Sequence, residues 1–414
     1  MLRRNALRQT AVFALAALLG SFCIGLTPTA AEAAPPSLEL DAKSAILIDY
    51  DSGQVLFEQN ADLPIAPASL TKLMTLHIAF ERIESGDISK DDLVNIRKEA
   101  WAATMPGSSV MFLEPGQIVT VEEIMKGIAI ASGNDASIAL AQHIAGSVDA
   151  FVDLMNQEAK ELGFTTFHFE DPAGLDPRNQ ITAREFAQFA RLYIQEHPEA
   201  LTELHSVKSF TYPQEHNIPE DKKGTTESIT QPNRNNLLGV VEGVDGLKTG
   251  FIEESGYNFA VTAKRGDMRL IGVILGVPGA NEEEGSAKRA EEGTELLEWG
   301  FKNFVSVTPE MPEIKPVRVW KGRAGQVELV PSAPVHLTVP RGTQDKLQAT
   351  VTQETSVIAP VTQGQKLGEL VFTADGQEVA RFDLLAANDV GLGNWFKRVW
   401  DTIRLTVIGW FTRD

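Results

Sequence analysis

The pattern of apolar residues changes after Phe304, and this change limits the possible fold more than any other feature of the chain. Before it, runs with helical spacing are mixed with short alternating runs, which predicts an α/β (α+β) domain over residues 34–304. After it, prolines at positions 309, 312 and 316 introduce short strand-like runs only. These runs are VRVWKG, GQVELV, VHLTVPRG and LQATVTQ, and they predict a small all-β domain over residues 305–388.

Within the first domain, several elements carry their own signals. The stretch AILIDYDSGQVLFEQN alternates around an Asp-Ser-Gly turn, as an antiparallel hairpin does. Residues 120–146 predict two buried helices that are interrupted at Ser132-Gly133-Asn134. The further expected elements are helices at 149–162, 182–196 and 285–304 and two strands at 257–264 and 268–277.

The N-terminus has the features of a secretory signal peptide. Three arginines precede an apolar run from Ala11 to Ile24, and Ala31-Glu32-Ala33 offers a small-residue cleavage site. We therefore expect residues 1–33 to be removed. Because the only cysteine of the chain, Cys23, lies in this segment, the mature protein is expected to have no disulfide and no thiolate site.

The chain is strongly acidic. Its formal net charge is −19, and removal of three arginines and one glutamate with the signal peptide gives −19 − 2 = −21. Such a charge disfavours nucleic acid and other polyanions as partners. Export and acidity together indicate an envelope or extracellular protein.

The last segment, residues 389–414, predicts an amphipathic helix. One stripe is apolar and aromatic, and a second stripe is polar. The apolar stripe is Leu392, Trp395, Phe396, Val399, Ile403, Val407, Trp410 and Phe411, and the polar one is Lys397, Arg398, Asp401 and Arg404. This pattern favours a helix that lies in a membrane interface, with residues 391–412 as the anchor. The alternative is that the stripe docks onto the protein's own core.

A possible reactive site begins at APASLTKLMTL. Ser69 precedes the helical run Leu70 to Ile83, and Lys72 lies one turn further on, so the hydroxyl and the amine can meet. A simpler interpretation makes Ser69 an N-cap and Lys72 a solvated cation. However, a positive charge in the first turn opposes the helix dipole, which favours a functional role.

A neutral lysine beside a serine can remove its proton, and a second cation nearby would help to keep that lysine neutral. Lys248-Thr249-Gly250 supplies a second lysine, and Ser132-Gly133-Asn134 supplies a serine and an amide. Each motif is short, but each occupies a place where an element begins, breaks or ends. The chain has no G-x-S-x-G or H-E-x-x-H motif and no zinc-site histidine spacing, and His77 and His143 are expected to be packing residues.

Ser-x-x-Lys, Ser-x-Asn and Lys-Thr-Gly together occur in penicillin-binding proteins and class A β-lactamases. Longer stretches, from residue 40 to the end, resemble one branch: the low-molecular-mass penicillin-binding proteins that act as D-alanyl-D-alanine carboxypeptidases. These stretches are GSSVMFLEPGQ, SGNDASIALA, QPNRNNLL, VDGLKTG, SGYNFAVTA and LLEWGFKNF. The resemblance implies a transpeptidase-like catalytic domain, a small β domain and a C-terminal anchor at the periplasmic face of the bacterial inner membrane.

The resemblance also implies roles for individual residues. Ser69 would be the acylated nucleophile and Lys72 its general base, while Ser132 would relay a proton to the leaving amine. The remaining implied residues contact substrate: Asn134 holds the substrate amide, Lys248, Thr249 and Arg234 bind the terminal carboxylate, and Gly250 leaves room for an oxyanion hole made by the N–H groups of Ser69 and Phe251.

The expected substrates are peptidoglycan stem peptides, with β-lactams as covalent inhibitors and with no cofactor or metal. Two alternatives remain open. A serine β-lactamase of class A needs a Glu-x-x-Leu-Asn motif, and the chain contains no Leu-Asn pair. A catalytically silent peptidoglycan-binding envelope protein would have no reason to keep all three motifs. The oligomeric state is left open.

Overall fold

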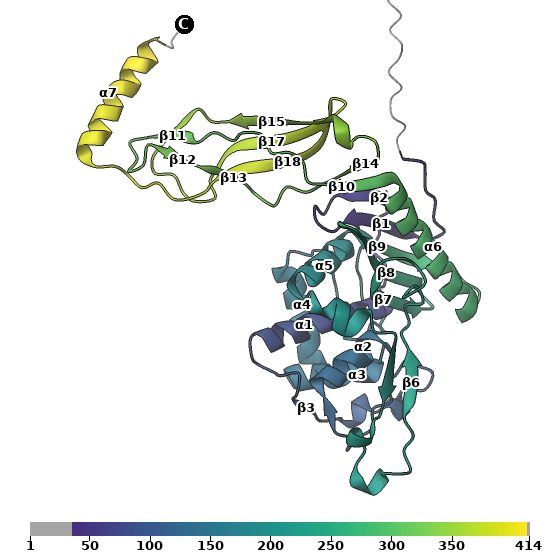
Figure 1. Ribbon diagram of the computed structural model, residues 1–414. Coiled ribbons are helices and arrows are strands. Elements are labelled where there is room, and N and C mark those ends of the chain that lie inside the picture. The colour runs from purple at the N-terminus through teal and green to yellow at the C-terminus, as the bar shows by residue number, and fades with distance from the viewer. Residues whose placement is uncertain (1–34, 412–414) are drawn as a thin grey trace, which may run out of the picture. The chain divides into compact units, whose positions relative to one another are not determined.

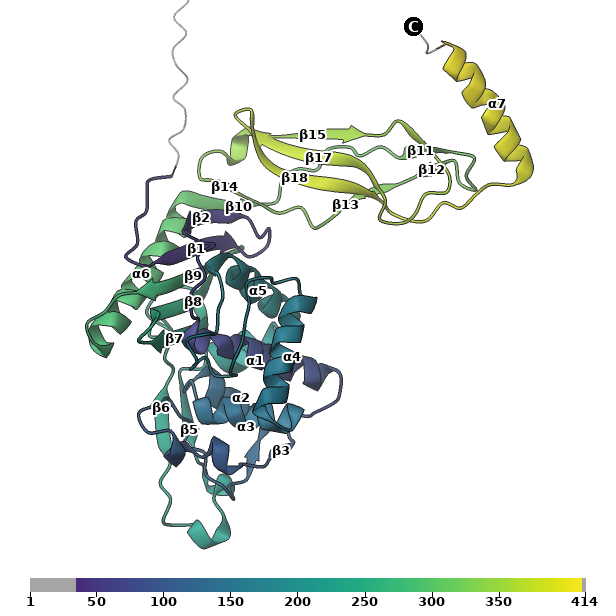
Figure 2. The same ribbon diagram turned by 180° about the vertical axis from the view of Figure 1, so that it is seen from behind.

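The computed structural model describes residues 35–411, with side chains described as far as residue 408. The expected signal peptide, residues 1–33 with Cys23, lies outside the described residues. Figures 1 and 2 show helices around one sheet, followed along the chain by β-rich segments and a last helix, α7.

The first region is organised on a five-stranded antiparallel sheet with strand order β2-β1-β9-β8-β7. The two predicted hairpins, β1–β2 and β8–β9, are confirmed. The bounds are β1 Ser44–Asp49, β2 Val55–Gln59, β7 Val244–Ile252, β8 Gly256–Arg265 and β9 Met268–Val277.

The edge strand β7 was not predicted. The Lys248-Thr249-Gly250 motif was expected ahead of a hairpin, but it lies inside β7, which pairs with β8 along its length. Two glycines, Gly246 and Gly250, and a lysine are poor strand formers, so the local sequence gives no strand signal here. The pairing with β8 overrides this low propensity.

Helices cover both faces of the sheet (Figures 1 and 2). On one face, α6 packs Leu296 and Leu297 against β8 and β9. On the other, α5 packs against β1 and β9 and belongs to the larger core cluster. The helices are α1 Lys72–Glu84, α2 Val121–Ala129, α3 Asn134–Ala145, α4 Val148–Glu161, α5 Ala183–Glu196 and α6 Glu282–Asn303.

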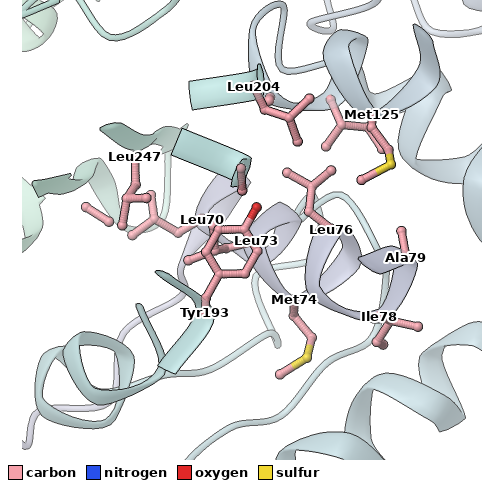
Figure 3. Packing of buried hydrophobic residues seen from close by; sticks show 14 of the residues in the cluster. Leu70, Leu73, Met74, Leu76, Ile78, Ala79, Met125, Tyr193, Leu204 and Leu247 are labelled. Carbon is pink, nitrogen blue, oxygen red and sulfur yellow. The ribbon is translucent and has the colours of Figure 1, made fainter. Parts of the chain in front are cut away.

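Helix α1 is surrounded by the core. Its residues from Lys72 to Phe80 are all buried, and Figure 3 shows Leu73 of α1 and Leu70, just before it, in one apolar cluster with Tyr193 of α5 and Leu247 of β7. Helix α2 begins with a capping box between Thr120 and Glu123, which fixes where it starts. The two short sheets near these helices pair β3 Leu93–Val94 with β4 Val119–Thr120 and β5 Ser209–Tyr212 with β6 Ile229–Pro232.

The second region is all-β and has its own apolar core, which includes Val339, Leu370, Phe372 and Leu384. Its strands form sheets in the orders β10-β14, β12-β11-β16 and β13-β18-β17-β15. The bounds are β10 Phe304–Val307, β11 Val317–Trp320, β12 Gln326–Val327, β13 Leu329–Pro331, β14 Leu337–Pro340, β15 Leu347–Gln353, β16 Ser356–Ile358, β17 Lys366–Ala374 and β18 Gln377–Ala386.

As far as residue 408, where the described side chains end, the apolar stripe of the C-terminal helix α7, Trp395–Phe411, is exposed. The predicted stripe side chains of Trp410 and Phe411 lie outside the described ones. Trp395 and Phe396 are 67% and 76% exposed. Within the polar stripe, Asp401 is buried and accepts a hydrogen bond from the backbone N–H of Lys321 at 2.7 Å. The backbone N–H needs an acceptor when it is covered, so this carboxylate faces the β-rich region instead of solvent.

Among residues 35–411, no single helix is long and apolar enough to cross a membrane. Helices α3 and α4 taken together have the length and apolar composition of a membrane span, but they are bent by 84° relative to each other.

Candidate active site

Ser69 lies in a 3-10 turn, Ala68–Thr71, that leads into α1. It does not cap the helix, because the residue at the N-cap is Thr71 and makes no side-chain capping bond. The residue before the serine, Ala68, has a φ of +52°, a strained value for a residue with a side chain. The turn places the Ser69 hydroxyl 2.9 Å from Nζ of Lys72.

Lys72 is completely buried and contacts three oxygens. Besides Ser69 Oγ, its Nζ donates to Oδ1 of Asn134 at 2.7 Å and to the carbonyl of Ala173 at 2.6 Å. Burial lowers the pKa of Lys72 from 10.5 to about 7, although the negative charges of Asp171 and Asp135 act in the opposite direction. A large fraction of this amine is therefore neutral at neutral pH.

The loop that carries the Ala173 carbonyl is ordered by one carboxylate. Asp171 accepts the backbone N–H groups of Ala173 and Gly174, both at 2.7 Å, and that of Asp176 at 2.8 Å. Gly174 has a φ of +82°, and a Cβ there would lie 1.8 Å from the carbonyl oxygen of Ala68. Only glycine therefore allows this loop to close over the turn before the nucleophile.

Ser132 and Asn134 come from the break between α2 and α3, as predicted. Ser132, with a φ of +61°, lies in the break after the end of α2, and Asn134 is the first residue of α3. The Asn134 side chain joins two segments: its Oδ1 accepts from Lys72, and its Nδ2 donates to Oγ of Ser108.

Lys248 is the second buried amine. Its Nζ donates to Oγ of Ser132 and to the carbonyl of Thr249, both at 2.9 Å. Burial lowers the pKa of Lys248 well below its usual value, and the charges of Lys72, Arg289 and Arg234 lower it further. Two serines are thus each paired with a desolvated lysine.

Strand β7 brings Gly250 against the nucleophile turn. A Cβ at Gly250 would lie 3.0 Å from the backbone nitrogen of Ser69 and 2.9 Å from the carbonyl oxygen of Pro67. The next residue, Phe251, stacks its ring on Tyr257, with 4.3 Å between centroids. The absence of a side chain at position 250 keeps the Ser69 N–H close to the strand.

A cavity of about 830 Å³ opens in front of these residues, a size within the range of small-molecule sites. Seven of the nine predicted site residues line it, and Lys72 and Lys248 are buried behind the two serines. The seven lining residues are Ser69, Ser132, Asn134, Arg234, Thr249, Gly250 and Phe251.

Sequence reasoning missed several residues of the site. Arg289 of α6 also lines the cavity and is 6% exposed, but an arginine in a helix gives no signal of this position. Ser108 and the Ala173 carbonyl are positioned by the fold. Asp171 could have been found, because an Asp-Pro-Ala-Gly sequence is typical of a turn in which the aspartate binds backbone N–H groups.

Comparison with known proteins identifies the family. The model for D-alanyl-D-alanine carboxypeptidases of peptidase family S11 matches residues 29–279. The chain belongs to this family. A second model, the C-terminal domain of penicillin-binding protein 5, matches residues 307–391. The predicted family and the predicted α+β, small β and C-terminal helix organisation are confirmed.

Individual relatives cover almost the whole chain. The D-alanyl-D-alanine carboxypeptidase DacC of Escherichia coli K12 is 39% identical over 398 residues, 94% of each protein. The crystal structure of penicillin binding protein 5 from Haemophilus influenzae is similar with a TM-score of 0.76 and 36% identity, and covers 86% of this chain and 99% of that one.

A third relative carries a ligand. Penicillin-binding protein D2 from Listeria monocytogenes, in its ampicillin-bound form, has a TM-score of 0.53 and 29% identity, and covers 64% of this chain and 100% of that one. The assignment as a serine carboxypeptidase of this family is therefore favoured over the β-lactamase and silent-binder alternatives.

Proposed function

We propose that the protein removes the terminal D-alanine from peptidoglycan stem pentapeptides through an acyl-enzyme on Ser69. The observation that carries the proposal is the pair formed by Ser69, which lines the cavity, and Lys72, which is buried directly behind it. The reaction class follows from family membership, and the roles of individual residues follow from their geometry.

The contacts of Lys72 suit a general base. A neutral amine has two N–H donors and one lone pair. The carbonyl oxygens of Asn134 and Ala173, at 2.7 and 2.6 Å, can take both donors. The lone pair is then left for the Ser69 hydroxyl at 2.9 Å, so the amine is oriented to accept the hydroxyl proton as the oxygen attacks.

The first chemical step forms a bond between Ser69 Oγ and the penultimate carbonyl carbon. The serine proton moves to Lys72, and the carbon–nitrogen bond to the last residue breaks when the leaving amine gains a proton. Ser132, whose hydroxyl lines the cavity and accepts a hydrogen bond from Lys248, can relay that proton: it gives its own proton to the leaving amine and takes up the one that Lys72 accepted, so Lys72 is neutral again for the next step. Water then attacks the ester, and the product acid leaves with Ser69 restored.

The negative charge that develops on the carbonyl oxygen needs nearby donors. Gly250 brings strand β7 against the backbone nitrogen of Ser69, and the next residue of that strand is Phe251. The two donors meant are the backbone N–H groups of Ser69 and Phe251. We assign them as the oxyanion hole. The Asn134 amide, which also lines the cavity, is assigned to hold the substrate peptide group.

The free carboxylate of the substrate is matched by the positive side of the cavity. Thr249 and Arg234 line it, and Arg289 adds a second guanidinium. We also assign Lys248 to the terminal carboxylate; it is 1% exposed and lies behind Ser132, to whose hydroxyl its Nζ donates. Charged partners of this kind select peptides with a free C-terminus.

The decisive experiment uses a synthetic stem pentapeptide that ends in D-alanyl-D-alanine. Mass spectrometry should show loss of one alanine with the mature protein and no change with Ser69→Ala. Loss of one alanine with both proteins would refute Ser69 as the nucleophile. An unchanged peptide with folded wild-type protein would favour the silent binder.

β-Lactams should acylate the same serine, as the ampicillin-bound relative supports. The chain lacks the Leu-Asn pair of class A β-lactamases, so release of the opened ring should be slow. Steady, rapid hydrolysis of a chromogenic cephalosporin would instead favour the β-lactamase alternative.

We also propose an exported protein held at the periplasmic face of the inner membrane. Its parts would be a signal peptide at 1–33, a catalytic domain at 34–304, a β domain at 305–388 and an anchor helix at 389–414. Support for the anchor comes from the exposed aromatic side chains Trp395, Phe396 and Trp400 of α7.

The anchor is tested by truncation after Ala387. The truncated mature protein should move from the membrane fraction to the soluble fraction and keep its peptidase activity. A matched control, Thr402→Ala on the same helix, should remain in the membrane fraction. Unchanged sedimentation of the truncated protein would refute the anchor.

A further inference from the structure

Two buried histidines, 120 residues apart in the sequence, meet outside the cavity described above. Nδ1 of His77 in α1 lies 3.0 Å from Nε2 of His197, which follows α5. Aromatic rings hold both imidazoles in place. Phe80 stacks on His197 with 4.8 Å between centroids, and Phe189 meets His77 edge-on at 5.6 Å. The two nitrogens are therefore positioned by packing.

The other nitrogen of each ring faces a glutamate. Nδ1 of His197 lies 3.0 Å from Oε1 of Glu84, and Nε2 of His77 lies 3.5 Å from Oε1 of Glu158. The Nε2 atom of His77 is buried and has no hydrogen-bond partner within residues 35–408. Each imidazole thus turns one nitrogen toward the other histidine and its second nitrogen toward a carboxylate.

Two further carboxylates border the gap between the histidines. Oε1 of Glu81 lies 3.8 Å from Nε2 of His197, and Oε2 of Glu196 lies 4.0 Å from Nδ1 of His77. One ligand atom from each of the four residues lies within 4.8 Å of all the others. Ligand atoms around a tetrahedral zinc are about 3.3 Å apart. Because Glu81 and Glu196 are about half exposed, their side chains can close the remaining distance.

We propose that His77, Glu81, Glu196 and His197 bind one Zn²⁺ ion. Two imidazole nitrogens and two carboxylate oxygens form a donor set that suits zinc, and the four groups allow tetrahedral coordination. Glu84 would then orient the outer nitrogen of a ligand histidine, as acidic residues commonly do in zinc sites.

A proton shared between the histidines is the competing explanation. It would account for the 3.0 Å contact, but it has no need of the two extra carboxylates. The zinc ion would use all four groups and would join α1 to the end of α5. Because α1 begins beside Ser69, the ion would stabilise the helix that supports the nucleophile without contacting the substrate.

The test uses mature full-length protein that has been treated with a chelator and dialysed. Zinc chloride is added, and the bound metal is measured by elemental analysis after gel filtration, with affinity from calorimetry. The wild type should bind one ion per chain and gain several degrees in Tm. The double variant Glu81→Gln, Glu196→Gln should bind at least about tenfold more weakly, because both changed residues are proposed ligands.

His216→Ala is the matched control, because His216 also pairs with a glutamate, Glu123 at 2.8 Å, but on the surface. Its zinc binding should equal that of the wild type. Acylation by a β-lactam verifies that each variant is folded. The proposal is refuted if folded wild type binds no zinc, as a shared proton predicts, or if the double variant binds it equally well.

Discussion

The rate at which a β-lactam acylates Ser69 should depend on pH with an acid limb near 7. Lys72 can accept the serine proton only when it is neutral, and burial brings its pKa to about 7. Below this value the amine is protonated, so the rate should fall about tenfold per pH unit. At pH 5 about 1% of the amine is neutral, against about half at pH 7, which corresponds to a rate lower by about 50-fold.

The size of the effect depends on the desolvation of Lys72. With its ordinary pKa of 10.5, only about 0.03% of the amine would be neutral at pH 7, and the rate would continue to rise up to about pH 10. The shift from 10.5 to about 7 corresponds to about 5 kcal/mol of preference for the neutral form. The position of the limb therefore reports directly on the burial of this side chain.

Stopped-flow measurement with a chromogenic cephalosporin between pH 5 and 9 would determine this profile. Lys72→Arg is the control, because a guanidinium keeps its proton over this range. The variant should lose about a thousandfold or more in acylation rate, together with the limb near pH 7. A flat wild-type profile between pH 5 and 8, or the same limb in the variant, would refute Lys72 as the base.

Three further substitutions test the packing of the site and the core. Gly250→Ala should slow acylation about tenfold or more in stopped-flow assays, because its Cβ would lie 3.0 Å from the Ser69 nitrogen; a wild-type rate would contradict the close approach. Gly174→Ala should lower the free energy of unfolding, measured with urea, by about 2–4 kcal/mol, since its Cβ would collide with the Ala68 carbonyl. Leu296→Ala, on the buried face of α6, should lower the free energy of unfolding by about 3 kcal/mol in the same measurement. A loss below about 1 kcal/mol would be inconsistent with the burial of this side chain.

Most elements of the first region could be predicted because each carries a local signal. The β1–β2 hairpin has an alternating pattern around a turn, and α2 and α3 have apolar faces separated by Ser132 in a left-handed conformation. Strand β7 could not be predicted in this way. Gly250 is required by the close approach to Ser69, a contact between residues 250 − 69 = 181 positions apart that local propensity does not encode.

Some residues of the candidate site could likewise be predicted from the sequence, and others could not. The three motifs contain five of the seven predicted residues that line the cavity, so their chemistry was visible in the sequence. The partners that orient Lys72, such as the Ala173 carbonyl, become neighbours only through the loop that Asp171 orders. The meeting of His77 and His197 is equally long-range, and zinc-site spacing along the chain gives no sign of it.

The helical pattern of α7 identifies its polar stripe but does not indicate what that stripe contacts. Periodicity assigned Asp401 to the polar face together with the lysine and arginines of the helix. In the structure this carboxylate is buried and accepts a hydrogen bond from the backbone N–H of Lys321. Amphipathic pattern indicates which face is apolar, but it does not indicate what the other face contacts.

The central claim is that Ser69, activated by Lys72, becomes covalently acylated. Intact-mass analysis after incubation with benzylpenicillin, followed by peptide mapping, tests it most directly. We expect one adduct per chain that carries the whole antibiotic mass, located on the peptide that contains Ser69 and absent from Ser69→Ala. No adduct on the folded wild-type protein, or an adduct that survives Ser69→Ala, would contradict the account.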